Sequence, residues 1–243
     1  MRHGQSAGNV ARDAATAANQ LLIDIAERDV DVPLSALGLR QAEALGHWLA
    51  ALPPAQQPNV LLYSPYLRAR ATAQAVLHCL QPETMLAVVA DERLREKEFG
   101  ITDRLTSRGI AEKYPELAAQ RQHVGKFYFR PPGGESWCDV ILRLRSVLDT
   151  ITREYRRERV LIVGHQVIVN CFRYLFERLD EDAILAIDRA ADVPNCGITS
   201  YQFDPGAGQR GKLVRELENF VAPLRDSGTP ITAKPDIPAA PKP

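Results

Sequence analysis

Two short apolar runs stand out along the chain, at residues 60–63 and 160–163. A turn follows each of them at once, Ser64-Pro65 after the first and Gly164-His165 after the second, and a helical pattern comes next. Continuous apolar runs of this length, bounded by turns, are typical of strands that are buried on both faces of a parallel sheet. A further strand is predicted at residues 86–89.

Helices are predicted where apolar residues recur every three or four positions and so share one face. Ser35 can cap a helix that the pair Pro53-Pro54 ends. The same spacing predicts a helix from about Tyr66 to Leu80, and a long one after the glycine-containing turn at residues 133–136. The alanine-rich stretch from Ala11 to Ala18 also favours helix.

This alternation of strands and helices predicts an α/β fold, namely a three-layer sandwich with a mostly parallel central sheet flanked by helices. Residues 201–203 and 213–217 are expected to close the sheet as a hairpin around Asp204-Pro205-Gly206. We predict one catalytic domain over residues 1–222. A Pro-rich tail over residues 223–243 is predicted to be disordered, because it lacks apolar periodicity.

Composition and charge argue against several classes of partner. The chain has 243 residues, in which 30 lysines and arginines balance 30 aspartates and glutamates. A balanced charge creates no field that would attract nucleic acid or an anionic membrane, so neither is expected as a partner. The four cysteines are scattered, without metal-ligand spacing. We therefore expect reduced thiols in a cytoplasmic protein that uses no metal and no other cofactor.

Four motifs carry residues that suit phosphoryl transfer: Arg2-His3-Gly4, Ser64-Pro65-Tyr66-Leu67-Arg68, Leu94-Arg95-Glu96 and Gly164-His165. A tripeptide as short as the first motif occurs by chance in some chains, but the ordered set is far more specific. Through these motifs the chain resembles the histidine phosphatase superfamily, the phosphoglycerate mutase-like group, from Arg2 to about Asn219. The stretch Val32-Pro33-Leu34-Ser35 is similar to an early segment of that superfamily.

The chemistry of phosphate esters agrees with this resemblance. A phosphate monoester stays negative through a loose transition state, so catalysis depends on positioning and on fixed positive charge, which Arg2 and Arg68 can supply. His3 is the predicted nucleophile, because a neutral imidazole can attack phosphorus and carry the group as a phosphohistidine. His165 is expected to stay protonated beside the phosphate oxygens. The resemblance implies that Glu96 protonates the leaving oxygen.

Two further residues are candidates for substrate binding. Asn9 completes an Arg-His-Gly-x-Ser-x-x-Asn pattern of the superfamily, which implies that its amide contacts phosphate. Gln166 follows His165 and either contributes its backbone or amide near the same site or only caps the following helix. In open α/β sheets, ligands bind beyond the carboxyl ends of the strands, where Arg68 and His165 are expected to lie.

The chain departs from the superfamily pattern in two places. The Arg-His-Gly motif of the superfamily ends the first strand of the sheet, whereas only Met1 precedes it here, so this strand is expected to be missing or truncated. If Met1 is the true start, the sheet lacks an inner strand and an α-amino cation lies beside His3. Otherwise a segment before Met1 supplies the strand, which we favour because the later motifs are present. The longer stretch from Val10 to Val30 forms a lid or packs outside the pocket.

These features predict a phosphomonoester hydrolase that acts through a phosphohistidine on a small phosphorylated metabolite or a phosphoprotein. Mutases of the superfamily use a long insert between the acid and the second histidine, but Glu96 and His165 are only 69 positions apart. Hydrolysis is therefore favoured over mutase transfer, although Lys126 and Arg130 could anchor a second acidic group. A degenerate scaffold that binds phosphate without turnover is a further alternative, against which the presence of both His3 and Glu96 argues.

Overall fold

The computed structural model describes residues 1–80 and 85–233, and the structural statements below refer to these residues. The strands are β1 (Val60–Tyr63), β2 (Ala87–Ala90), β3 (Val160–Val163), β4 (Ile198–Asp204) and β5 (Lys212–Phe220). The α-helices are α1 (Ala7–Ala17), α2 (Ala36–Ala51), α3 (Leu67–Cys79), α4 (Ser107–Lys113), α5 (Pro115–Val124), α6 (Trp137–Glu154), α7 (Gln166–Glu177), α8 (Glu181–Ala190) and α9 (Ala222–Asp226). Short 3-10 helices are η1 (Asp29–Asp31), η3 (Glu92–Leu94) and η4 (Gly100–Thr102).

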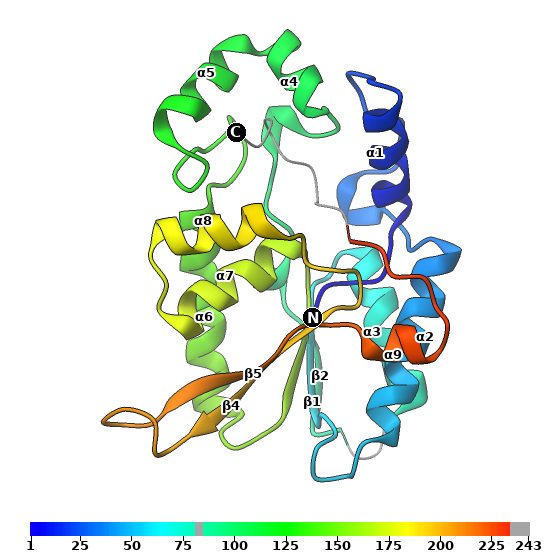
Figure 1. Ribbon diagram of the computed structural model, residues 1–243, viewed down its shortest axis with the longest axis vertical. Coiled ribbons are helices and arrows are strands. Elements are labelled where there is room, and N and C mark those ends of the chain that lie inside the picture. Colours follow the sequence, from blue (N-terminus) through cyan, green and yellow to red (C-terminus); the bar gives the residue numbers. More distant parts are fainter. Residues whose placement is uncertain (81–84, 234–243) are drawn as a thin grey trace.

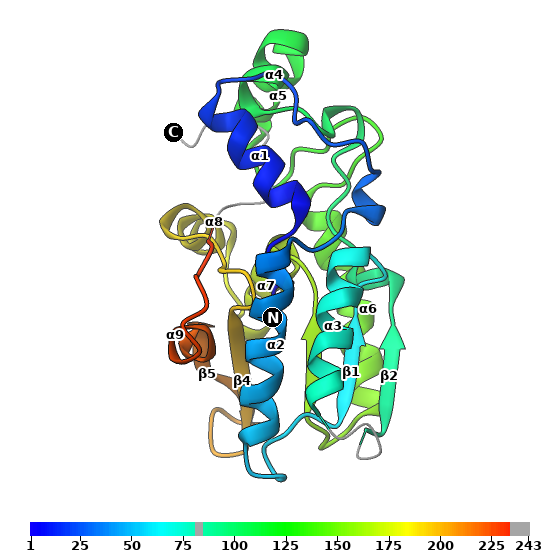
Figure 2. The same ribbon diagram turned by 90° about the vertical axis from the view of Figure 1, so that its right-hand side faces the viewer.

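The central sheet is parallel, with the strand order β2-β1-β3. Successive side chains of a strand point to opposite faces. Leu61 therefore packs with α2, α3 and α9, whereas Val60 and Leu62 pack with α6, α7 and α8. Each of these three side chains is at most 3% exposed, and burial of one such side chain contributes roughly 1.5–3 kcal/mol. Figures 1 and 2 show the helices on the two sides of the sheet, as predicted for a three-layer α/β sandwich.

Serine caps begin two of the predicted helices. The Ser35 hydroxyl accepts a hydrogen bond from the Gly38 amide at 3.0 Å at the start of α2. The Ser136 hydroxyl accepts from the Asp139 amide at 3.2 Å, and the Asp139 carboxylate accepts from the Ser136 amide at 2.8 Å. Such caps contribute about 1 kcal/mol each. The predicted strands at 60–63 and 160–163 are confirmed, and β2 lies one residue later than predicted.

β4 and β5 form the predicted hairpin, but the prediction that they close the central sheet was wrong. They pair with each other as a separate two-stranded antiparallel sheet. The link to the central sheet runs through the first residues of the chain instead. The Arg2 amide donates to the Gly197 carbonyl at 3.3 Å, and the Cys196 amide donates to the His3 carbonyl at 3.3 Å, just before β4 begins.

The other side of the Arg-His-Gly segment pairs with the end of β3. The Met1 amine donates to the Ile162 carbonyl at 2.7 Å, and the Met1 carbonyl accepts from the Gly164 amide at 3.0 Å. Among the described residues, a short extended segment around Arg2 therefore lies between β3 and the start of β4. In a chain that begins at Met1, burial lowers the pKa of the Met1 amine to about 5, so this amine is neutral at pH 7.

Residues 223–233 are ordered, which corrects the predicted extent of the disordered tail. Leu224 of α9 is 0% exposed in the core beside α2. Further along, the Gln41 side-chain amide donates to the Pro230 carbonyl at 2.9 Å, and Thr232 bonds both Gln41 and Asn195. Composition does not reveal these contacts, because their partners are far away in the sequence. The rest of the predicted tail, residues 234–243, lies outside the described residues.

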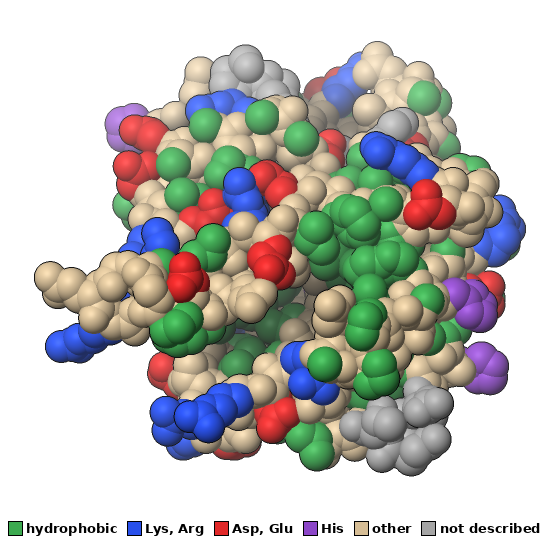
Figure 3. All heavy atoms as spheres, turned by 60° about the horizontal axis from the view of Figure 1, so that its bottom comes forward, with side chains coloured by type: hydrophobic (Ala, Val, Ile, Leu, Met, Phe, Trp, Pro, Cys, Tyr) green, Lys and Arg blue, Asp and Glu red, His purple; other side chains and the backbone are tan. Residues whose placement is uncertain are grey.

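Charges of both signs are mixed on the surface shown in Figure 3. Lysine and arginine side chains alternate there with aspartates and glutamates, and hydrophobic side chains gather beside a hollow. No patch of a single sign dominates this face, in agreement with the balanced composition. In the part of the chain that the structure describes, no helix is both long enough and apolar enough to span a membrane.

The buried amine predicts a pH-dependent stability for protein that begins at Met1. The pKa of this amine is 8.0 in its ordinary environment and about 5 in the fold. Between these values the unfolded chain binds a proton that the folded chain does not. Above pH 8 the amine is neutral in both states and does not affect stability, and the free energy of unfolding decreases as the pH falls towards 5. The loss amounts to about 4 kcal/mol.

Urea denaturation at pH 8.5, 7, 6 and 5 would measure this change in the free energy of unfolding. The matched control is the same protein acetylated at the Met1 amine, which removes the titrating group. We expect a shallower pH dependence for the acetylated protein over this range. Equal pH dependence in the two proteins would show that the amine is solvated.

Candidate active site

His3 and the adjacent Gly4 are held by backbone and side-chain contacts from three other parts of the chain. Its amide donates to the Gly164 carbonyl at 2.9 Å, and its carbonyl accepts from the Asn195 side chain at 3.1 Å. The next residue, Gly4, donates its amide to the Thr72 hydroxyl of α3 at 3.1 Å. These contacts leave the His3 side chain 0% exposed and fixed at the carboxyl end of β3.

Two glycines allow the motif to lie directly against the first turn of α2. A methyl group on Gly38 would lie 1.9 Å from the Gln5 carbonyl oxygen, and one on Gly4 would lie 2.3 Å from the Gly38 carbonyl oxygen. Both contacts are far closer than atoms can approach, so any larger side chain would move the backbone that carries His3. The Ser35 amide and hydroxyl bond the Gln5 carbonyl and side chain at 2.9 and 2.7 Å and hold the same junction.

The hydrogen bonds of His3 identify its tautomer. Nδ1 lies 2.6 Å from the Gly4 carbonyl oxygen. A carbonyl only accepts, so Nδ1 carries the proton and Nε2 carries the lone pair. Nε2 accepts from Arg68 Nε at 3.3 Å. The nitrogen with the lone pair therefore faces the guanidinium that was predicted to bind phosphate.

The second histidine lies against the first. The ring centroids of His3 and His165 are 5.1 Å apart, in an edge-to-face arrangement. His165 Nε2 is 2.8 Å from the Ser64 hydroxyl, and Nδ1 is 3.7 Å from Glu96 Oε2. The other Glu96 oxygen accepts from the Lys97 amide at 2.8 Å. The predicted nucleophile, second imidazole and acid thus share one buried cluster.

Arg2 and Asn9 are two further candidates from the sequence. Arg2 is fully buried, and its Nη1 donates to the Val193 carbonyl at 2.7 Å. Asn9 forms a capping box with Ser6 at the start of α1, in which its carbonyl oxygen accepts from the Ser6 amide at 3.0 Å. This contact identifies which atom of the Asn9 amide is the oxygen and which is the NH₂ donor.

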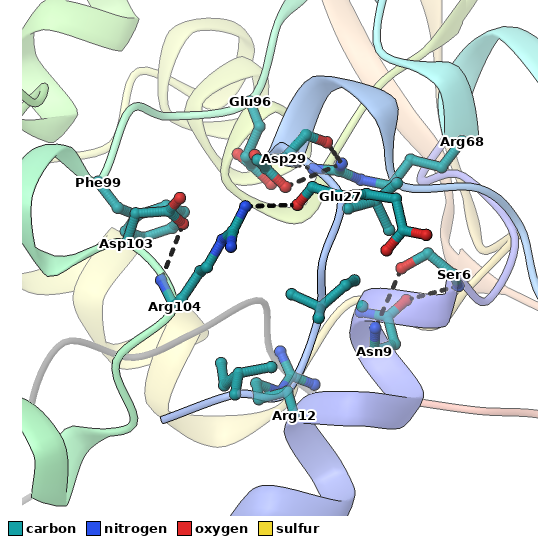
Figure 4. A pocket seen from close by; sticks show the side chains of 14 residues that line it. Ser6, Asn9, Arg12, Glu27, Asp29, Arg68, Glu96, Phe99, Asp103 and Arg104 are labelled. Atoms are coloured by element: carbon teal, nitrogen blue, oxygen red, sulfur yellow. Dashed lines mark hydrogen bonds and ion pairs between the residues drawn. The ribbon is translucent and has the colours of Figure 1, made fainter. Parts of the chain in front are cut away.

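A pocket opens next to this cluster (Figure 4). It reaches Asn9, Arg68 and Glu96 on its inner side. Its outer wall comes largely from residues 18–32, here called the covering segment, and from residues 99–104. Most of the covering segment belongs to the stretch from Val10 to Val30 that the sequence left undecided, and it lines the pocket rather than packing away from it. Its contributions to the wall are Ile23, Ile25, Glu27, Asp29 and Val32.

The covering segment is tied to the chain across the pocket. The Ile23 amide donates to the Arg104 carbonyl at 2.8 Å, and the Thr106 amide donates to the Leu21 carbonyl at 3.0 Å. The Arg104 guanidinium donates to the Glu27 carbonyl at 2.8 Å. Desolvation and the nearby Asp29 carboxylate raise the pKa of the Asp103 carboxyl beside it. The pocket wall therefore carries acidic groups as well as arginines.

The pocket lining does not include Gln166, Lys126 or Arg130, nor does it include the buried Arg2, His3 and His165. The Gln166 amide donates to Asp192 at 3.2 Å, and His165 rather than Gln166 is the N-cap of α7. Lys126, considered as an anchor for a second acidic group, pairs with Asp188. Arg130, considered for the same role, is exposed and pairs with Asp139. Lys126 and Arg130 are therefore paired with carboxylates, and neither belongs to the pocket lining.

Other residues near the site were not assigned by sequence analysis. Ser64 belongs to a recognised motif, and its position after β1 is the signal that could have singled it out. Asp29, Glu27 and Arg104 had no such signal, because they lie in a stretch without motif or periodicity. Their position depends on how the covering segment folds back over the sheet.

No metal site accompanies the cluster: the described residues contain no group of three or more histidine, cysteine or acidic side chains arranged to hold a metal. The cysteines are free thiols. Burial raises the pKa of Cys196 to about 12 and raises the pKa of Cys171 further, so these two are poor nucleophiles at neutral pH.

Comparison of sequences gives a consistent family. The chain matches the histidine phosphatase superfamily (branch 1) over residues 1–214. Phosphoglycerate mutase-like protein AT74H of Arabidopsis thaliana is 31% identical over 175 residues, 69% of this chain and 55% of that protein. A 6-phosphofructo-2-kinase/fructose-2,6-bisphosphatase of Caenorhabditis elegans is 31% identical over 206 residues, 81% of this chain and 41% of that protein. The chain spans about half the length of these curated relatives.

Solved structures share the fold. Bacillus stearothermophilus YhfR has a TM-score of 0.66 and 25% identity, covering 92% of this chain and 96% of that one. Mycobacterial glucosyl-3-phosphoglycerate phosphatase in complex with VO3 has a TM-score of 0.66 and 21% identity, covering 90% and 96%. The alpha-ribazole phosphatase of Shigella flexneri has a TM-score of 0.68 and 18% identity, covering 91% and 96%. Together with the family match and the geometry of the site, these likenesses lead to one conclusion: the chain belongs to the histidine phosphatase superfamily.

Proposed function

We propose that the protein is a phosphomonoester hydrolase that acts through a phosphohistidine on a small phosphorylated metabolite or a phosphoprotein. One observation carries the proposal. Nδ1 of His3 is committed to the Gly4 carbonyl, so the lone pair of Nε2 is directed at the Arg68 guanidinium, beside a second buried imidazole. A nucleophilic nitrogen next to fixed positive charge is what transfer of a phosphoryl dianion requires.

In the proposed first step, His3 Nε2 attacks phosphorus in line with the leaving oxygen. The P–N bond forms as the P–O bond to the alcohol breaks, and Glu96 transfers a proton to the departing oxygen. Arg2, Arg68 and a protonated His165 balance the charge of the equatorial oxygens. In the second step Glu96 takes a proton from water, whose oxygen attacks phosphorus, and the P–N bond breaks to release phosphate and restore neutral His3.

The choice of hydrolysis over mutase transfer has structural support. A mutase must hold the second acidic end of its substrate while the phosphohistidine waits. Lys126 and Arg130 are engaged by Asp188 and Asp139, so neither offers such an anchor at the pocket. Several similar structures are named phosphatases. The mutase remains the second candidate, because a curated relative is named phosphoglycerate mutase-like.

The first prediction concerns the covalent intermediate. Brief incubation with a labelled phosphate ester, followed by alkaline denaturation, should leave an acid-labile label on His3. His3→Ala should abolish both the label and the turnover, because no other group replaces the nucleophile. His78→Ala is the matched control, since His78 lies exposed near the end of α3 and should change neither. A label found on another residue would reject the assignment, and phosphate binding without any turnover would favour the degenerate scaffold.

The second prediction separates proton donation from charge balance. Glu96→Gln should slow alkyl phosphates, whose leaving groups need a proton, by about 10²–10⁴-fold. Aryl phosphates with acidic leaving groups should lose less than about tenfold, because they depart without a proton. Glu92→Gln makes the same chemical change at an exposed position of η3 and serves as the control. Equal losses on both kinds of ester would rule out the role of Glu96 as acid.

The third prediction decides between hydrolysis and transfer. With phosphoglycerate supplied, free phosphate should appear faster than the isomeric phosphoglycerate, with or without a bisphosphate primer. The reason is that the pocket lining offers no anchor from Lys126 or Arg130. Both products can be followed in one reaction. Isomer formation that outruns phosphate release would assign the protein to the mutases.

A further inference from the structure

The Arg68 guanidinium is already engaged by an anion of the protein itself. Asp29, in η1 of the covering segment, lies 3.0 Å from Arg68 Nη1 through Oδ1 and 3.4 Å from Nη2 through Oδ2. Nη1 also donates to the Asp29 backbone carbonyl at 2.6 Å. Figure 4 shows Asp29 and Arg68 facing each other at the pocket. A carboxylate that meets both terminal nitrogens resembles the way a phosphate would meet them.

The same arrangement covers the nucleophile. His3 and His165 are 0% exposed and Arg68 is 5% exposed. The third nitrogen of Arg68, Nε, donates to His3 Nε2 at 3.3 Å, where phosphorus has to approach. A phosphate cannot take both terminal nitrogens of Arg68 while Asp29 holds them. Binding of substrate therefore requires that Asp29 release Arg68.

The contact is suited to exchange. Asp29 has 36% of its side chain exposed, so its carboxylate is desolvated only in part and can return to water at low cost. Arg68 is nearly buried and retains its charge, so it needs an anion whether or not substrate is present. A phosphate dianion carries more charge than a carboxylate and offers more acceptor oxygens. It can therefore replace Asp29, while an anion of single charge competes less well.

We propose that Asp29 is an internal anion that occupies the phosphate-binding arginine when no substrate is bound, and that the phosphate of the substrate displaces it. The inference rests on the proposed function only in taking Arg68 as a phosphate ligand. Because Arg68 also bonds the Asp29 backbone carbonyl, η1 shifts together with the side chain. The ties of Leu21 and Ile23 to residues 104–106 hold the preceding part of the covering segment in place.

The test compares two aspartates of the same 3-10 helix. Asp29→Asn removes the competing charge and keeps the shape. Asp31→Asn is the matched control, because Asp31 pairs with the exposed Arg28 rather than with the site. Calorimetric titration with inorganic phosphate should give a dissociation constant about tenfold lower for Asp29→Asn than for the unchanged protein, equivalent to about 1.4 kcal/mol. Asp31→Asn should stay within about twofold.

Turnover gives an independent measurement. For an aryl phosphate, KM should fall in Asp29→Asn while kcat changes little, because Asp29 no longer contacts Arg68 once the substrate is bound. Asp29→Ala, checked by its melting temperature, should reproduce the change if the asparagine variant is poorly folded. Unchanged or weaker phosphate binding by folded Asp29 variants would overturn the inference and would mean that Asp29 supports Arg68 instead.

The outcomes also separate this inference from the proposed function. Tighter phosphate binding by Asp29→Asn, in a protein that turns over no ester, would support the displaced aspartate and reject the hydrolase. Turnover through His3 with unchanged phosphate affinity in Asp29→Asn would do the reverse. Absence of phosphate binding in all three proteins would remove Arg68 as a phosphate ligand and the inference with it.

Discussion

The hydrogen bond from the His3 amide to the Gly164 carbonyl determines the arrangement of the site. It joins the first motif of the chain to the last, because His165 follows Gly164 directly. With this bond in place, the two imidazoles lie with their centroids 5.1 Å apart. Arg68 and Glu96 then meet them from the ends of α3 and η3. The scaffold that maintains this hydrogen bond is the fold that the chain shares with its superfamily and with the similar solved structures.

Most of the scaffold could be predicted from local sequence. The apolar runs of β1 and β3 and the serine caps of α2 and α6 act over a few residues, so their signals are visible in the chain itself. The positions of Arg68 and His165 could be predicted as well, since each follows a buried strand, whereas His3 and Glu96 were assigned through the resemblance of their motifs to the superfamily. The predicted closure of the sheet by the hairpin failed for a different reason. Local sequence does not show which backbone will lie between β4 and the central sheet. Here the segment around Arg2 lies there and hydrogen-bonds the residues just before β4.

The covering segment shows the limit of local reasoning most clearly. No periodicity or motif in residues 18–32 indicates that Asp29 would meet Arg68, because the contact forms only when the segment crosses the pocket. The same holds for Thr232. The sequence around it lacks apolar periodicity and therefore predicted disorder, but its hydrogen bonds to Gln41 and Asn195 place it in the fold. In both cases a single polar side chain is positioned by partners that the sequence does not bring near.

The supports of His3 also bear on the order of folding. The bond from Asn195 to the His3 carbonyl spans 192 positions, and that from the Met1 amine to Ile162 spans 161. Contacts of such long sequence separation carry a large loop-closure cost and form late relative to local helices. During synthesis His3 emerges long before Asn195. The contacts that support His3 therefore cannot be complete until Asn195 has left the ribosome.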